Sequence, residues 1–321
     1  MRNEQFRRDS FLIPRSSFLS LLGNPLAAKE LRARMRGARP FIVATVYLAP
    51  LCALAVALYG VVAASTTGSV ATGTPVGKLY FATVSGFELA LICLLAPALT
   101  ADLISGERER RTYDLLLVTP LSSGQIVVGK LVAGLGSLLV LLILALPLQA
   151  IGIVLGGVGL EELGVAFAIL VLTALTYGCV GLFWSTRLRT TRSAMAMAYG
   201  MTALGILGQP AVLFLGLLLV QIFGLPASLL GQAFVSGGTL ASPLEAQLAA
   251  AAGQLMAATN PLLTGVFTAF VLAQGRGPVF VERLGGQDVT YISPWLLFAL
   301  VHLLASGVLI GLTRRGVRNE E

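Results

Sequence analysis

Long apolar runs separated by short polar segments dominate this chain, a pattern typical of a protein that crosses a membrane several times. A membrane-spanning helix needs about 20 apolar residues. Five runs reach that length, over residues 41–64, 79–103, 131–155, 165–184 and 294–313. A sixth run, 194–223, is broken by Gln209-Pro210 and would measure about 45 Å as a straight helix, against a hydrocarbon core of about 30 Å. We expect it to be a kinked span whose end projects from the membrane.

The region between the last two spans, residues 224–293, contains an uncharged run at 246–274 that is cut by Asn260-Pro261. A seventh span here would move the arginine-containing tail, residues 314–321, to the outer side, against the charge distribution described below. Two short helices that dip into the outer face of the membrane, or lie on it, fit the pattern better. The predicted fold class is an all-α polytopic membrane protein with six transmembrane helices and short outer-face helices between spans five and six.

The composition excludes a soluble protein. Apolar residues make up 56% of the chain, while charged residues make up 12%, about half the share usual in soluble domains. The three cysteines, Cys52, Cys93 and Cys179, lie far apart in apolar runs, so we interpret them as packing residues. A single histidine, His302, excludes zinc motifs that need two. We therefore predict no catalytic residue, metal site or cofactor site, and do not expect an enzyme.

The basic residues predict the orientation of the spans. Nineteen of the 22 Lys and Arg residues fall in residues 1–40, in the loops 104–130 and 185–193, and in the tail 314–321. The other three are Lys78, Arg276 and Arg283. Because loops rich in Lys and Arg stay on the cytoplasmic side, we expect both termini in the cytoplasm, below a cytoplasmic (inner) membrane. The net charge of +7 reflects this orientation and predicts no nucleic-acid partner.

An amphipathic helix is predicted over residues 25–37, before the first span. Asn24-Pro25 is typical of a helix start. The apolar positions that follow are spaced by four residues: Ala27, Leu31 and Met35. Another face carries the basic residues Lys29, Arg32 and Arg36. Such a helix lies on the inner membrane surface, in contact with lipid; the alternative is a plain positively charged anchor.

The loop between spans two and three carries the strongest functional signal. Residues 105–130 read SGERERRTYDLLLVTPLSSGQIVVGK: alternating charges, an apolar patch, a Thr-Pro stop, and a Ser122/Gln125 capping box that starts the next helix. A cytoplasmic loop that exposes Leu-Leu-Leu-Val to water predicts a docking surface for a partner. The alternative is that these leucines pack on the membrane face.

The same loop contains a GxxxxGK sequence, Gly124–Lys130, which resembles the start of a phosphate-binding loop. The next residue is Leu131, where such a loop needs Ser or Thr to hold Mg²⁺, and no strand is predicted before it. We therefore expect no ATP site in this chain.

The segments NPLAAKELRARMRG and LLAPALTADLISGERERRTYDLLLVTPLSSGQIVVGKL, within residues 24–135, resemble the membrane-spanning permease of exporter-type ABC transporters, the ABC type-2 permease superfamily. The resemblance implies a prokaryotic inner-membrane permease that forms the translocation path as a dimer, with a second copy or a paralogue. It also implies separate ABC ATPase subunits that bind ATP and Mg and contact a coupling helix in this loop. The residues assigned to coupling are Glu107, Arg108, Glu109, Arg111, Thr112, Asp114, Leu115, Leu116, Leu117, Thr119 and Pro120.

Two ionisable residues lie deep in the predicted spans, Glu88 in span two and His302 in span six, about 14 and 12 Å from the outer end. Intramembrane ionisable residues are functional candidates by default. The two side chains either touch or share a polar path, or they are buried separately against hydroxyls and carbonyls. The alternative functions are an ion- or proton-coupled secondary transporter that uses this pair, and a scaffold that docks a partner without transport.

Overall fold

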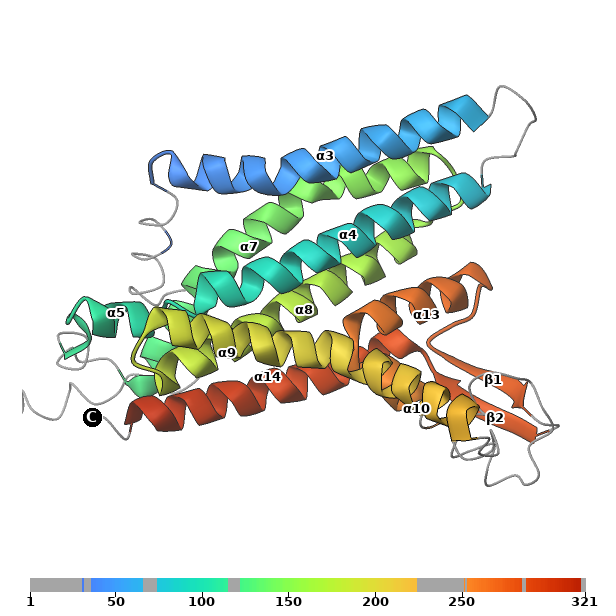
Figure 1. The fold of residues 1–321 in the computed structure, drawn as a ribbon. Helices are drawn as coiled ribbons and strands as arrows, with labels where there is room; N and C mark the ends of the chain where they lie inside the picture. Colours follow the sequence, from blue (N-terminus) through green and yellow to red (C-terminus); the bar gives the residue numbers. More distant parts are fainter. Residues whose placement is uncertain are drawn as a thin grey trace, which may run out of the picture.

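The computed structural model of the protein describes residues 31, 36–65, 74–114, 122–223, 251, 253–284 and 287–318. Within these residues, long helices run side by side as one bundle, and a short β-hairpin stands at one end (Figure 1). The chain is therefore mostly helical where it is described, as the hydrophobic pattern predicts.

Helices occupy all six apolar runs. Five of them are long and apolar enough to cross a membrane. Their bounds are α3 Arg39–Ser65, α4 Thr74–Thr100, α7 Ser123–Val154, α8 Leu160–Arg187 and α14 Pro294–Arg318. The sixth run is divided into three consecutive segments, α9 Thr191–Ala203, the π-helix η3 Leu204–Gly208, and α10 Gln209–Phe223.

The two ends of the bundle differ. At one end lie the short helix α5 (Ser105–Glu109), the starts of α7 and α9, and the last turn of α14 with the C-terminus (Figure 1). The hairpin, the end of α10 and the end of α3 lie toward the other end (Figure 1). Segments that are rich in Arg and far apart in the sequence thus meet at the α5 end.

The break in the sixth run is a π-helix that begins at Leu204, before the expected kink at Gln209-Pro210. Proline has no backbone N–H, so the carbonyl of Ile206, four residues before Pro210, loses its usual helical donor. The side-chain amide of Asn260 donates to this carbonyl instead, with an N···O distance of 2.8 Å. Asn260 therefore supplies the hydrogen bond that Pro210 cannot give to the Ile206 carbonyl.

Among the described residues between α10 and α14, two short helices meet at Asn260. Helix Gly253–Thr259 and α13 (Pro261–Ala273) are inclined at 119°. The Asn260 side-chain oxygen accepts hydrogen bonds from the backbone N–H groups of Leu262 and Leu263, at 2.9 and 3.3 Å, and so caps α13. The structure breaks the run at the position that the sequence marks, while residues 224–250 lie outside the described part.

The all-α prediction is wrong for residues 279–292, which form an antiparallel hairpin. Strand β1 (Val279–Leu284) pairs with β2 (Gln287–Ile292), and the rings of Phe280 and Tyr291 stack across it at 5.6 Å. The signal is in the sequence, because β-branched and aromatic residues are concentrated on both sides of the dipeptide Gly285-Gly286. The prediction failed because the low charge of the whole region was interpreted as helix at the membrane.

Close approach at glycines shapes the core around α4. A Cβ on Gly77 of α4 would lie 1.8 Å from the carbonyl oxygen of Gly156 and 2.8 Å from that of Gly152. These two glycines form a GxxxG sequence, the motif that lets membrane helices touch. Another copy of that motif, Gly307 and Gly311, meets no atom within 4 Å at either Cβ position. Only the first therefore packs helices within the described residues.

Large apolar side chains point outward along the bundle. On α3, Phe41, Val46 and Val56 are 75%, 67% and 71% exposed, and Val212 and Phe214 on α10 are similarly exposed. Soluble proteins rarely show apolar surface on this scale, whereas lipid tails solvate it without cost. The outer surface is that of a protein embedded in a bilayer.

The predicted amphipathic helix falls mostly outside the described residues, including Lys29 and Arg32. Leu31 is helical and half-buried, and its Cδ1 lies 2.9 Å from the position that a Cβ on Gly136 of α7 would take. Arg36 is exposed in a bend before α3. Leu31, on the expected apolar face, therefore packs on the bundle, and the helix over 25–37 stays a prediction.

Candidate functional site

The charged segment that follows α4 is held at its start by α8. The hydroxyl of Ser185 accepts hydrogen bonds from the backbone N–H groups of Ile104 and Ser105, both at 2.9 Å. The Ser105 hydroxyl in turn donates to the carbonyl of Ala101 at 2.7 Å. All of these residues are buried. The entrance to α5 is therefore fixed on α8 through Ser185.

The last residue of α5, Glu109, bonds to the first residue of α9. Its carboxylate accepts hydrogen bonds from the backbone N–H of Thr191 at 2.8 Å and from the Thr191 hydroxyl at 3.1 Å. The first N–H groups of a helix lack helical acceptors, and the helix dipole there is positive, so a carboxylate stabilises this end. Glu109 therefore ties the segment to α9.

A third contact joins the segment to α7. Lys130 Nζ lies 2.7 Å from Glu107 Oε1, and the side chains are 2% and 28% exposed. Lys130 is the lysine of the GxxxxGK sequence. That sequence lies on α7, which begins after the predicted capping box: the Ser122 hydroxyl accepts from Gln125 N–H, and Gln125 accepts from Ser122 N–H. The lysine is engaged within the bundle, and no strand precedes it in the described residues.

The segment reverses direction immediately after α5. Arg111 adopts a left-handed φ of 56°, and the N–H of Thr112 donates back to the carbonyl of Glu107 at 2.9 Å. The guanidinium of Arg108 lies over the ring of Tyr113, 4.9 Å from its centroid. Asp114, the last described residue here, is exposed. The other residues assigned to coupling lie outside the described residues: Leu115, Leu116, Leu117, Thr119 and Pro120.

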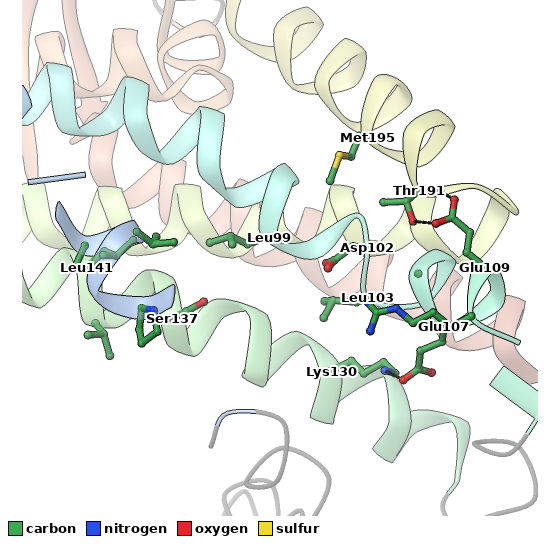
Figure 2. Close-up of a pocket in the computed structure, with 16 residues that line it drawn as sticks. Leu99, Asp102, Leu103, Glu107, Glu109, Lys130, Ser137, Leu141, Thr191 and Met195 are labelled. Atoms are coloured by element: carbon green, nitrogen blue, oxygen red, sulfur yellow. Dashed lines mark hydrogen bonds and ion pairs between the residues drawn. The ribbon is translucent and has the colours of Figure 1, made fainter. Parts of the chain in front are cut away.

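A cavity of about 710 Å³ opens beside these contacts, among α3, α4, α5, α7 and α9 (Figure 2). One part of its wall is apolar, with Leu99, Leu141 and Met195. The other part is charged, with acidic and basic side chains from α5 and α7. Figure 2 shows the Glu107–Lys130 and Glu109–Thr191 contacts at this charged edge. The lining suits a molecule that has both a polar and an apolar part.

Glu88 belongs to a buried polar cluster that joins three helices. The Tyr47 hydroxyl of α3 donates to Glu88 Oε1 at 3.0 Å, and the side-chain amide of Gln149 on α7 donates to Oε2. The three side chains are at most 2% exposed. Each carboxylate oxygen of Glu88 thus has a donor from a different helix.

His302 is buried in a separate group. Its Nδ1 lies 2.9 Å from the Thr176 hydroxyl of α8, and its ring stacks on Phe298 with a centroid distance of 3.9 Å. The Thr176 hydroxyl also lies 3.1 Å from that of Ser306. Between Glu88 and His302, both within the described residues, there is no hydrogen bond or ion pair. Glu88 and His302 thus have different hydrogen-bond partners in the structure.

A family comparison completes these observations. Residues 24–228, which include α3 to α10 and the charged segment, match the family model described as ABC-2 family transporter protein. The chain belongs to the ABC-2 transporter family. It is therefore a multi-pass transmembrane permease of an ABC transporter. No curated protein matches the chain.

In this ABC-2 permease the functional residues serve transport rather than catalysis, because members of the family are membrane components of the transporter and not themselves catalytic. Across the described ranges, no three His, Cys, Asp or Glu side chains gather closely enough to hold a metal ion. The acidic residues of α5 engage instead in bonds to neighbouring helices.

Sequence reasoning found the charged segment of the permease but missed its partners. Ser185 and Thr191 carry no motif, since a serine or threonine near a helix end is common. Lys130 was considered only as part of a rejected phosphate loop. Tyr47 and Gln149, the partners of Glu88, looked like ordinary span residues. The only available signal for Thr191 was the capping pattern of the helix start at Thr190.

The two buried acid–base groups of the permease should behave independently. We expect Glu88→Gln combined with Tyr47→Phe to be non-additive in unfolding free energy by more than about 0.5 kcal/mol, because the residues share a hydrogen bond. Glu88→Gln combined with His302→Gln should be additive within about 0.5 kcal/mol, since they share no partner. Denaturant unfolding of the purified variants in detergent measures both double-mutant cycles. Equal coupling in the two cycles would contradict the separation.

Proposed function

We propose that the chain is the permease subunit of an ATP-driven exporter and that the segment beginning at α5 transmits the work of a separate ATPase. The observation that carries this proposal is the attachment of α5 to three helices at once, through Ser185 of α8, Thr191 of α9 and Lys130 of α7. These contacts support the proposal because a displacement of α5 would act on three helices together.

The geometry suits force transmission. The helical path from α4 runs through α5 as far as Glu109, so a push on the charged turn acts directly on the end of span two. The Leu115–Leu117 patch begins four residues after Arg111, where the chain has just reversed direction. In the proposal, this apolar patch enters a groove of the ATPase, and Glu107–Arg111 set its register by charge.

The Arg-rich α5 end of the bundle also supports a proposal for how the helices are oriented in the membrane. We propose six spans, with the fifth made of α9, η3 and α10, and with both termini and the α5 end in the cytoplasm of a prokaryotic cell. The positive-inside rule supports this orientation, because the Arg-rich segments meet at the α5 end. Helix Gly253–Thr259, α13 and the hairpin then lie at the outer face.

Topology can be measured by cysteine labelling. In a variant without Cys52, Cys93 and Cys179, single cysteines at Glu161 and Gln287 should react with a membrane-impermeant maleimide in intact cells. A cysteine at Arg189 should react only after permeabilisation. The reverse pattern at Gln287 and Arg189 would overturn the orientation. Gly157 is unsuitable for this test because its φ of 89° strains any L side chain.

We propose that the permease works as a dimer, with a second copy or a paralogue, and that ATP and Mg are bound by the ATPase subunits. The cavity beside α5 favours an amphipathic cargo, because its lining is apolar on one side and charged on the other. The separation of Glu88 from His302 gives less support to a secondary transporter that relays protons through this pair. A scaffold without transport remains the competing function.

A Leu→Asp scan of residues 115–117 tests the coupling proposal. Burial of one of these leucines in a partner contributes about 1.5–3 kcal/mol, and an aspartate there leaves an unpaired charge in an apolar groove. We expect at least one position to abolish the permease-stimulated ATPase activity of a copurified ATPase. Arg110→Ala is the control, and should reduce stimulation only slightly because Arg110 is exposed and exposed charges contribute about 0–1 kcal/mol.

The outcomes separate the candidate functions. Membrane insertion and dimer formation should be unchanged in every scan variant. If no ATPase copurifies from detergent, the exporter proposal fails and the secondary transporter or scaffold replaces it. If an ATPase copurifies but all three aspartate variants retain full stimulation, coupling does not pass through this loop.

A further inference from the structure

A second cavity, of about 220 Å³, lies among α4, α8 and α13, toward the end of the bundle away from α5. Its lining residues recur every three or four positions along 78–89 of α4, 162–170 of α8 and 262–272 of α13. One face of each helix therefore borders the cavity. Residues 78 to 89 extend about 16 Å along α4 at 1.5 Å per residue, which is close to the depth of one membrane leaflet.

Two hydroxyl groups in this otherwise apolar wall lack a hydrogen-bond partner. Ser85 and Thr268 both line the cavity, and their side-chain oxygens are buried without a bond to any atom of the described residues. Helical hydroxyls normally bond back to the preceding turn. Thr83 and Thr264 on the same two helices do so, to the carbonyls of Leu79 at 2.7 Å and of Asn260 at 2.9 Å. The hydroxyls of Ser85 and Thr268 are thus left for another acceptor or donor.

The mouth of the cavity carries one charge of each sign. Lys78 Nζ and Glu162 Oε1 are 4.0 Å apart, at the limit of an ion pair, and their side chains are 40% and 17% exposed. Both residues line the cavity. A loose, partly exposed pair at the membrane surface matches a headgroup that itself carries both charges.

We propose that this cavity binds a membrane phospholipid with a zwitterionic headgroup. One acyl chain fills the space among α4, α8 and α13, and the headgroup lies between Lys78 and Glu162, with its phosphate toward the lysine and its ammonium toward the glutamate. Ser85 lies about 10 Å along α4 from Lys78, at a depth where the ester groups below a headgroup are found. Its hydroxyl and that of Thr268 donate to an ester carbonyl. The site depends on membrane insertion alone, and not on ATP-driven export.

Two glycines in the wall offer a clean way to fill the cavity. Gly265 and Gly86 line it, and a Cβ built on either meets no atom within 4 Å. Gly60 on α3 is a matched control, because its Cβ position is equally open but does not border the cavity. A phenylalanine at Gly265 therefore blocks the acyl chain, whereas one at Gly60 meets lipid elsewhere.

Photo-cross-linking tests the proposal. The full chain is placed in nanodiscs that contain phosphatidylethanolamine with a diazirine on one acyl chain, and the cross-linked peptides are mapped by mass spectrometry. We expect cross-links concentrated on residues that line the cavity, such as Phe81, Ile169 and Ala269. Gly265→Phe, and independently Gly86→Leu, should reduce them at least five-fold, while Gly60→Phe leaves them unchanged. Lys78→Ala with Glu162→Ala should remove the preference for phosphatidylethanolamine over phosphatidylglycerol carrying the same probe.

Three results would overturn the site. Equal cross-linking in Gly265→Phe, Gly86→Leu and Gly60→Phe would show that no chain occupies the cavity. Cross-links confined to outward residues such as Phe267 and Phe270 would show ordinary contact with surrounding lipid. Equal labelling of the unsubstituted protein by the zwitterionic and anionic probes would exclude headgroup recognition by Lys78 and Glu162.

Discussion

Gly181→Leu should prevent the permease from folding. Gly181 of α8 faces α4 so closely that a Cβ there would lie 2.1 Å from the Thr100 hydroxyl, 3.1 Å from the Pro97 carbonyl oxygen and 3.2 Å from the Ala101 nitrogen. Two of these atoms are backbone, so a side chain at this position must separate the two helices. Overpacking a tight core costs about 1–3 kcal/mol when side chains can yield, and here they cannot.

The matched control is Gly164→Leu on the same helix. Gly164 is exposed, and its Cβ position meets no atom within 4 Å. We expect this variant to give normal yields of monodisperse protein by size-exclusion chromatography in detergent, while Gly181→Leu gives aggregate. Gly181→Ala should be less severe, and Thr100→Ala should partly rescue it by removing the nearest atom. Equal yields of the two leucine variants would refute the close packing of α4 on α8.

Glu107→Ala should destabilise the α5 end by about 3 kcal/mol. Lys130 is almost completely buried and lies 2.7 Å from Glu107. Loss of one partner of a buried ion pair typically costs about 3–5 kcal/mol, because the remaining charge has lost its counter-charge. The lower value applies here since Glu107 is partly exposed. Denaturant unfolding of the purified permease measures the loss.

A double variant distinguishes this cause from general damage to the segment. Glu107→Ala with Lys130→Met removes both charges, so it should recover most of the stability that Glu107→Ala loses. Arg110→Ala, in the same segment and exposed, should change the unfolding free energy by no more than about 0.5 kcal/mol. A double variant as unstable as the single would contradict an energetic role for the ion pair.

Most of the helical framework was predictable because membrane spans obey a single strong rule. A helix in lipid must be apolar over about 20 residues. The apolar runs at 41–64 and 131–155 therefore predict α3 and α7 without any tertiary information. The helix ends were less predictable: α7 starts at Ser123, eight residues before its apolar run, because a capping box and the contact of Lys130 with Glu107 extend it beyond the membrane.

The hairpin and the π-helix escaped prediction for a different reason. Residues 279–292 are rich in β-branched and aromatic residues, which favour strands, but the low charge of the whole region was interpreted as a helix at the membrane surface. The position of η3 depends on Asn260, which lies 54 residues away in the sequence and donates to Ile206. Long-range polar partners of this kind, like Ser185 for α5, leave no trace in a local pattern.

The run formed by α9, η3 and α10 is attached by hydrogen bonds to two different parts of the molecule. Glu109 accepts a hydrogen bond from the first residue of this run, Thr191. Asn260 donates one to the Ile206 carbonyl, fifteen residues later and about 22 Å along the axis. In the proposed coupling, a displacement of α5 reaches α9 through Glu109 and passes along this run to Asn260, at the start of α13. Pro210 leaves the Ile206 carbonyl free to accept from Asn260. The proline is therefore as important to this path as Glu109.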